Sequence, residues 1–279
     1  MMPRRVHDGA RGFTMLEMLV SMGIFLLICA SAFTLLGVSQ QKYQTESQVL
    51  TSFEEAQLGL DQIVRDVNDS GYPPPNQFQV PPPDYNGYAT YADTPVAWSP
   101  GYTQTPQSSC FIGGGSSPAC VSPGADGLGM FLETNLTPQI PNSPVQYIRY
   151  RLVNTTLYRG VIPKITGQDP YITIPDSSLV PFVQNVMNNA SPAQIAQINA
   201  AYPNMFPGGA PVPVFTYLFD TPYGPLPSSD PRCYSFNTPR NIRSIVITLI
   251  VQTPTPDPQT GRLRVIELTG RGSRINSFN

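Results

Sequence analysis

Histidine is nearly missing from this chain. The single histidine among its 279 residues is His7. Serine–histidine–aspartate triads, histidine metal sites and histidine general bases each need an imidazole. Residues 8–279 contain no histidine, so they cannot form any of these sites. The Gly-x-Ser-x-Gly segment of serine hydrolases does not occur either. We expect a protein that is not an enzyme, with no catalytic residue, no bound metal and no cofactor.

Charged residues are also scarce. They make up 12% of the chain, about half the usual share, and the net charge is −2. Nucleic-acid-binding domains carry a concentrated basic face, so we expect no nucleic-acid partner. Proline is abundant instead, with 32 residues. Low charge combined with much proline, glycine, serine and tyrosine is typical of an extracytoplasmic, β-rich domain with long loops, and enough apolar residues remain for a folded core.

Cysteine is rare, and the four cysteines are Cys29, Cys110, Cys120 and Cys233. Cys29 lies in an apolar run, where a thiol is usually a small packing residue. Cys110 and Cys120 bracket a short loop, and an exported chain can close such a loop with a disulfide. Free thiols, or a pairing with Cys233, are the alternatives. A zinc site is disfavoured because no histidine is available to complete it.

Proline is absent from residues 4–72. This gap predicts one continuous helix over 13–69, roughly 86 Å long at 1.5 Å per residue. Its first part, 13–38, is almost wholly apolar and, at roughly 39 Å, is long enough to cross a bilayer. The second part, 39–70, is amphipathic. Its apolar stripe consists of Val49, Phe53, Ala56, Leu60, Ile63 and Val67, widened by Leu50, Leu58 and Val64.

One acidic residue interrupts the apolar segment. Glu17 is its fifth residue, and a carboxylate near a bilayer core costs roughly 2.5–3.5 kcal/mol or more. Such a residue is functional by default and needs a partner. Cleavage between Gly12 and Phe13 would create one. The new α-amine would lie one helical turn from Glu17 of the same chain, or beside Glu17 of a neighbouring subunit.

This arrangement resembles the class III signal of type IV pilins and type II secretion pseudopilins. The matching residues are Gly12, Phe13, Thr14, Leu16 and Glu17, followed by an apolar helix. The resemblance implies cleavage after Gly12 by a prepilin peptidase, N-methylation of Phe13, and pairing of Glu17 with the Phe13 amine of another subunit. It implies as partners the prepilin peptidase/methyltransferase, other pilin or pseudopilin subunits, an inner-membrane assembly platform and the lipid bilayer.

Three other interpretations compete for the apolar segment. An ordinary secretory signal peptide would end at the small residues 30–32, but it leaves Glu17 without a purpose. A lipoprotein signal would end at Cys29, but Ile28 lies where a small residue is needed. A plain single-pass anchor is the third interpretation.

Basic residues at the N-terminus predict the orientation in the membrane. Arg4, Arg5 and Arg11 are expected to stay in the cytoplasm. We therefore expect a single-pass inner-membrane protein with a periplasmic or extracellular C-terminal domain, transferred later to a pilus or pseudopilus. The predicted organisation is a leader (1–12), a transmembrane and filament-core helix (13–38), its amphipathic continuation (39–70) and an extracytoplasmic β-rich domain (71–279) with insertions at about 73–125 and 160–210.

Beyond the helix, alternating and β-branched runs predict antiparallel strands. The expected strands are 129–134, 145–152, 156–159, 214–220, 242–252 and 262–268, with Gly270 onward as a tail. Asn154 and Thr155 form the turn of a hairpin. Two helices are expected in the second insertion, one near 179–189 and one over 193–201 with Ser191 as its N-cap. The predicted fold is α+β: a long helix packed on an antiparallel β-sheet domain with long loops, as in pilins.

The order of these elements is similar to that of the PilW-type minor pilins and the related J-type pseudopilins. The similar segments are Arg65-Asp66-Val67 and Gly71-Tyr72 at the helix end, Tyr150-Arg151-Leu152 with Leu157-Tyr158-Arg159 in the hairpin, Phe215-Thr216-Tyr217 with Asp220, and 242–249. The resemblance implies a minor pilin or pseudopilin, a structural subunit for filament assembly or tip initiation. The alternative is a membrane-anchored extracytoplasmic adhesin or binding module that does not polymerise.

Charge is distributed unevenly along the chain. Residues 39–70 carry six acidic and two basic residues, whereas residues 232–279 carry seven arginines and two acidic residues. Complementary faces between neighbouring subunits would use this difference, and contacts within one chain would explain it equally well.

Overall fold

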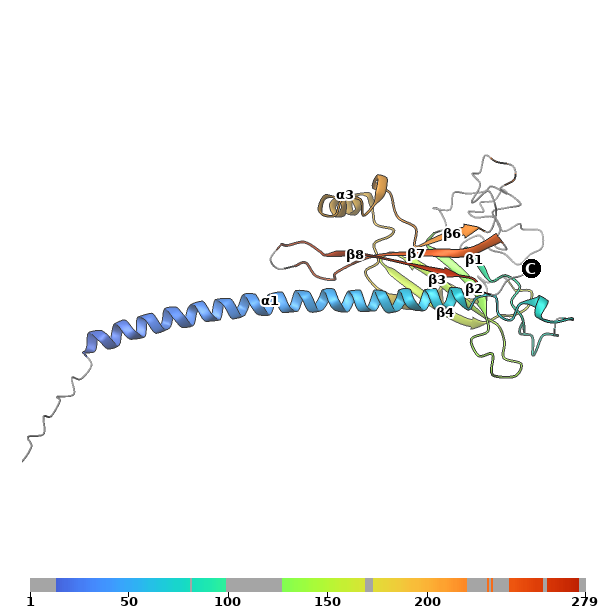
Figure 1. Cartoon of the computed structure of the whole chain (residues 1–279), viewed down its shortest axis with the longest axis horizontal. Coiled ribbons are helices and arrows are strands. Elements are labelled where there is room, and N and C mark those ends of the chain that lie inside the picture. Colours follow the sequence, from blue (N-terminus) through green and yellow to red (C-terminus); the bar gives the residue numbers. More distant parts are fainter. Residues whose placement is uncertain are drawn as a thin grey trace, which may run out of the picture.

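The structure is a computed structural model that describes residues 14–80, 82–98, 127–168, 173–219, 230, 232, 241–257 and 260–275. Figure 1 shows one long helix whose C-terminal half carries a domain with two antiparallel sheets. The predicted α+β architecture is confirmed.

The long helix α1 (Met15–Asn68) has 54 residues and differs from the predicted span by two residues at its start and one at its end. It begins at Met15 because Thr14 is its N-cap. The Thr14 hydroxyl oxygen accepts a hydrogen bond from the Glu17 N–H, and the Glu17 carboxylate accepts one from the Thr14 N–H. This reciprocal capping box satisfies backbone donors that an isolated helix start leaves unpaired. At the other end the chain turns away at Gly71, whose φ is 83°.

The first sheet has five antiparallel strands in the order β1-β2-β3-β4-β5. They are β1 (Val96–Trp98), β2 (Gly129–Thr134), β3 (Gln146–Val153), β4 (Thr156–Pro163) and β5 (Val180–Val183). The predicted hairpin is confirmed, with Asn154 in the turn at a φ of 54°. Strand β1 was not predicted, because three residues are too few to show an alternating pattern.

The helix expected near 179–189 is wrong. Its first residues form the edge strand β5, which pairs with β4. Pro181 fits an edge strand because it has no N–H to donate to a further neighbour. Val183 packs beside Gly59 of α1, where an added Cβ would lie 2.4 Å from Val183 Cγ2. The segment therefore gains both a strand partner and a contact with α1, and neither can be recognised from its local sequence.

The second sheet has three antiparallel strands, β6 (Phe215–Phe219), β7 (Ile242–Gln252) and β8 (Val265–Ser273). Strand β8 begins later than expected and continues to Ser273, so the assignment of Gly270 onward as a tail is wrong. Gly270 pairs with Ile247 and Gly272 pairs with Ile245. Glycine in a strand interior usually weakens the strand. The presence of glycine at these two positions is explained by the helix α1, which covers them.

Two glycines allow α1 to lie directly on β8. A Cβ added to Gly270 would lie 2.9 Å from Leu60 Cδ1, and one added to Gly272 would lie 2.6 Å from Val67 Cβ. Both distances are shorter than an ordinary van der Waals contact. The missing side chains thus set how closely the helix approaches the sheet.

A Gly272→Val variant is expected to lose about 1–3 kcal/mol of unfolding free energy, because its side chain would overlap Val67 in a packed core. Denaturant unfolding of the full chain in detergent, followed by circular dichroism, measures this loss. Thr269→Val is the matched control, since Thr269 is exposed on the same strand. Equal stability of the two variants would contradict the close approach.

The main core lies between α1 and the two sheets. Four residues of the predicted apolar stripe contribute to it, namely Ala56, Leu60, Ile63 and Val67. Phe53 of the stripe is 40% exposed, however, and Leu50 and Leu58 are 59% and 71% exposed, so the predicted stripe is wrong at Phe53 and its widening is wrong at the two leucines. The helix presents only one narrow face to the domain.

Helix α3 (Pro192–Ala201) confirms the helix predicted after Ser191. Ser191 and Gln194 form a capping box in which each side chain accepts the other residue's backbone N–H. Ile195 and Ile198 pack in a second, smaller apolar cluster against β7 and β8. Three short 3₁₀ helices complete the described elements: η1 (Pro75–Gln77), η2 (Asp176–Ser178) and η3 (Pro207–Gly209).

Candidate functional site

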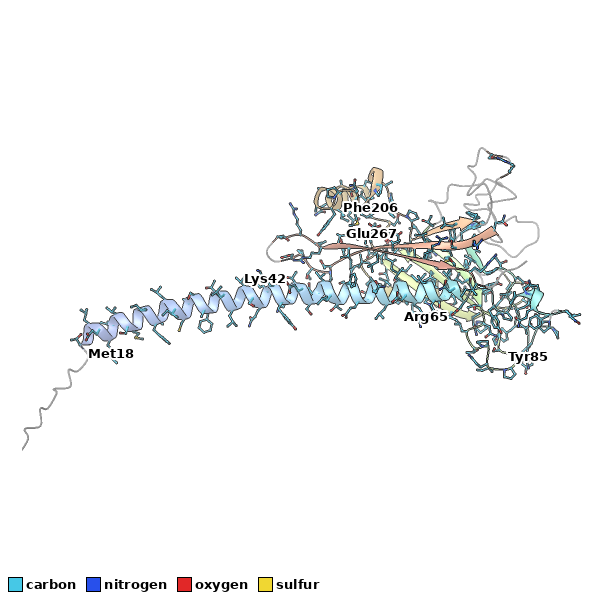
Figure 2. All side chains as sticks on the ribbon, viewed as in Figure 1. Met18, Lys42, Arg65, Tyr85, Phe206 and Glu267 are labelled. Atoms are coloured by element: carbon cyan, nitrogen blue, oxygen red, sulfur yellow. The ribbon has the colours of Figure 1, made fainter. Side chains whose placement is uncertain are left out.

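The N-terminal half of α1 extends away from the domain. Figure 2 shows no other element beside the helix near Met18. Its large apolar side chains are exposed from Met15 to Val38, as in Leu19 at 65% and Phe25 at 63%. Within the described part of the chain, α1 is the one helix long and apolar enough to cross a membrane. Such a continuous apolar surface is stable only against lipid or against other apolar helices.

The carboxylate of Glu17 lies at the very start of this helix. Its Oε2 atom accepts hydrogen bonds from the backbone N–H and the hydroxyl of Thr14, both at 2.9 Å. Glu17 is exposed, and these bonds turn the carboxylate back toward the N-terminus of the helix. The next residue toward the N-terminus is Phe13. The carboxylate is therefore bonded to the residue that directly follows Phe13 in the sequence.

The structure places only part of the predicted site. Gly12 and Phe13 lie outside the described residues, as do Cys110, Cys120 and Cys233. Cys29 is described, lies on α1 and is a free thiol. The predicted cleavage and the predicted disulfide between Cys110 and Cys120 thus remain predictions.

Comparison with known protein families supports the site at the helix start. The family described as "Prokaryotic N-terminal methylation motif" matches residues 8–33. This span includes Gly12, Phe13 and Glu17 and most of the apolar segment, residues 13–33. No curated protein and no solved structure matches the chain significantly. The motif supports a protein similar to type IV pilins or pseudopilins, anchored in a membrane by its N-terminal helix, and proteins with this motif are structural rather than catalytic.

An ionic cluster that the sequence does not reveal joins the other end of α1 to the first sheet. Asp66 is only 2% exposed, and its Oδ2 atom accepts from the Tyr150 hydroxyl at 2.6 Å and from Arg159 Nη2 at 2.8 Å. Arg159 Nε also donates to the Tyr150 oxygen at 3.0 Å. Burial and the neighbouring Asp66 charge raise the pKa of Tyr150 well above its usual value. Tyr150 therefore stays protonated and donates to the carboxylate.

The pattern of α1 alone did not suggest this cluster. Asp66 lies off the predicted apolar stripe, which is typical of a solvated position. Its partners come from β3 and β4, 84 and 93 residues further along the chain. Asp66 of α1 thus pairs with an arginine of the first sheet and not with one of the basic segment 232–279.

A second buried ion pair fixes the segment before β1 to the sheet. Lys164 Nζ lies 2.8 Å from Glu133 Oε2 and 2.7 Å from Asp93 Oδ2. Glu133 also accepts the backbone N–H groups of Asp93 and Thr94. Burial alone would lower the pKa of Lys164, but the two carboxylates outweigh burial and raise this pKa. The Glu133 Oε2 atom and Lys164 thus hold the loop in place, whereas Glu133 Oε1 is buried without a hydrogen-bond partner among the described residues.

Proposed function

We propose that this chain is a minor pilin or pseudopilin, a non-enzymatic structural subunit of a type IV pilus or a type II secretion filament. The observation that carries the proposal is the methylation motif at residues 8–33, which leads directly into an apolar helix with exposed side chains. A helix of this kind is stored in the inner membrane and is later packed among like helices in a filament.

Processing is the first step of the proposed mechanism. The leader, residues 1–12, orients insertion through its arginines and keeps the N-terminus in the cytoplasm. A prepilin peptidase cuts between Gly12 and Phe13, and the same enzyme methylates the Phe13 amine. The capping box at Thr14 supports this step, because it starts the helix just after the proposed cut.

Assembly is the second step. Residues 13–38 form the transmembrane and filament-core helix, and Glu17 neutralises the Phe13 amine of a neighbouring subunit. An exposed carboxylate at the helix start supports this role, since its bonds to Thr14 can be exchanged for an ion pair without refolding the helix. The assembly platform of the inner membrane and other pilin or pseudopilin subunits are the partners.

The extracytoplasmic domain is the third part of the proposed mechanism. Residues 39–70 carry the domain of residues 71–279 outside the membrane, where the insertions at about 73–125 and 160–210 face partners. A disulfide between Cys110 and Cys120 closes a loop of the first insertion. The domain is larger than a main fibre subunit needs, which favours assembly or tip initiation over bulk polymer.

N-terminal mass spectrometry tests the processing step. The protein purified from its host is expected to begin at methylated Phe13, and a Gly12→Leu variant is expected to retain all twelve leader residues. Gly9→Leu is the matched control and should be cut normally. A mature chain that begins at Phe33 would instead identify an ordinary signal peptide and would refute the proposal.

A further inference from the structure

The β7–β8 hairpin points back along α1 toward the apolar half of the helix (Figure 1). The Thr255 hydroxyl donates a hydrogen bond to the side chain of Gln48 on α1. Thr45, one turn closer to the apolar segment, is only 9% exposed although its neighbours on the helix are exposed. The hairpin end therefore covers α1 at least to the level of Thr45.

This level is close to the expected membrane boundary. Thr45 lies seven residues beyond Val38, which is about 10 Å along a helix. The headgroup layer adds roughly 5–7 Å to each side of the hydrocarbon core. The gap between the hairpin end and the headgroups is thus only a few Å, which one extended arginine side chain can span.

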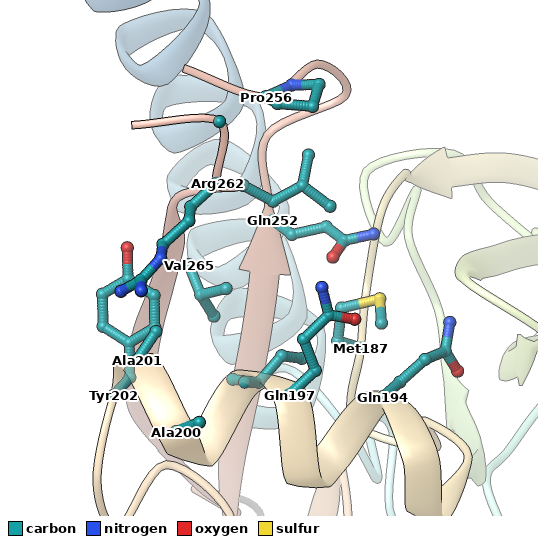
Figure 3. A pocket seen from close by; sticks show the side chains of 13 residues that line it. Met187, Gln194, Gln197, Ala200, Ala201, Tyr202, Gln252, Pro256, Arg262 and Val265 are labelled. Atoms are coloured by element: carbon teal, nitrogen blue, oxygen red, sulfur yellow. The ribbon is translucent and has the colours of Figure 1, made fainter. Parts of the chain in front are cut away.

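A hollow lined by several polar and charged residues opens at this hairpin end. It has a volume of about 380 Å³ and is lined by Ala201, Tyr202, Asp257, Thr260, Arg262 and Arg264. A neighbouring hollow of similar size shares Tyr202 and Arg262 and continues along α3, as Figure 3 shows. Arginine, threonine and tyrosine donors suit a phosphate group, and tyrosine is enriched at the membrane–water interface.

Two cations on this side of the domain are available, Arg262 in the lining of the hollow and Lys42 on α1, which does not line it. Arg264 is paired with Asp257 at 2.9 Å. Arg262 and Lys42 are exposed and have no ion-pair partner among the described residues. Glu46 lies one turn of α1 beyond Lys42, on the side away from the apolar segment. The surface nearest the membrane is therefore basic.

We infer that the β7–β8 hairpin end and the C-terminal end of α3 bind the headgroups of anionic phospholipids while the subunit is anchored in the membrane. Arg262 and Lys42 contact the phosphates, and Tyr202 lies at the interface. This contact would hold the domain upright on the membrane before assembly. The inference rests on the proposed function only in that α1 crosses a bilayer.

Hydrogen exchange of the full chain in lipid nanodiscs tests this inference. Discs of phosphatidylcholine alone are compared with discs that also contain phosphatidylglycerol. In the anionic discs we expect exchange in residues 253–264 to be at least roughly fivefold slower, because each of the two basic side chains contributes about that factor near an anionic surface. High salt is expected to remove the difference, because it screens exposed charges.

A matched pair of variants identifies the residues. Arg262→Gln combined with Lys42→Gln is expected to abolish the protection in anionic discs. Arg243→Gln, at the opposite end of the same hairpin, is expected to leave it unchanged. Exchange in α1 near Ile63 reports whether each variant remains folded.

The outcomes separate this inference from the proposed function. Equal exchange in both kinds of disc, with the protein inserted, would overturn the headgroup contact alone. Protection by inorganic phosphate in the zwitterionic discs would assign the hollow to a soluble anion and would also overturn it. A chain that fails to co-purify with either disc would refute the membrane anchor, and the inference with it.

Discussion

A Glu17→Val variant is expected to be cleaved and methylated normally but to be absent from filaments. Cleavage would not require the carboxylate, because the cut lies between Gly12 and Phe13. Assembly would require it, because the Phe13 amine of an incoming subunit would otherwise enter an apolar core as an unpaired charge. An isolated charge in a membrane-like core costs roughly 2.5–3.5 kcal/mol or more, so we expect incorporation to fall by roughly sixtyfold or more.

Immunoblots of sheared filaments against membrane fractions measure this effect. Ser21→Ala is the control, since the Ser21 hydroxyl only donates to the Glu17 carbonyl at 2.7 Å within the helix. It should be incorporated normally. Normal surface display and function of the Glu17→Val protein would instead favour an anchored adhesin or binding module that does not polymerise.

An Arg159→Met variant is expected to lose about 3–5 kcal/mol of unfolding free energy. The substitution leaves the Asp66 carboxylate 2% exposed and without its cation, and breaking a buried pair from one side costs this much. Chemical denaturation of the full chain in detergent gives the value. The loss should separate α1 from the first sheet before the second sheet unfolds, because Asp66 joins α1 to β3 and β4.

Two further variants make this prediction specific. Arg151→Met removes an exposed partner of Asp176 from the neighbouring strand and is expected to cost less than about 1 kcal/mol. Adding Asp66→Asn to Arg159→Met is expected to restore part of the stability, because the double variant buries no charge. A double variant as unstable as the sum of both singles would show that the two residues do not interact.

The sequence predicted those elements whose signals are local. The absence of proline from residues 4–72 predicted α1, and Asn154 predicted the hairpin between β3 and β4. Ser191 followed by proline predicted α3, because a cap and a fixed φ at the first turn act within a few residues. The motif of Gly12, Phe13 and Glu17 could be recognised for the same reason, because its residues are close together in the sequence.

The failed predictions involve elements whose state depends on distant partners. The local sequence of residues 179–189 does not distinguish a helix from a strand. Its first residues form β5 because they pair with β4. Gly270 and Gly272 read as a tail because glycine is depleted in strands, yet both lie in β8 beneath α1. The exposure of Leu50 and Leu58 could not be predicted either. An amphipathic pattern identifies the apolar face of a helix, but it does not show how much of that face the domain buries.

By itself, the amino-acid order determined a long, proline-free helix, an acidic residue at its apolar start, and several strands and caps. These depend on backbone sterics and on hydrogen bonds between residues a few positions apart. Only the tertiary structure decided that Asp66 is buried with Tyr150 and Arg159, and that the β7–β8 hairpin reaches down α1 to Gln48. Such contacts join residues from 84 to 207 positions apart, and their energy exists only after both sheets have packed against the helix.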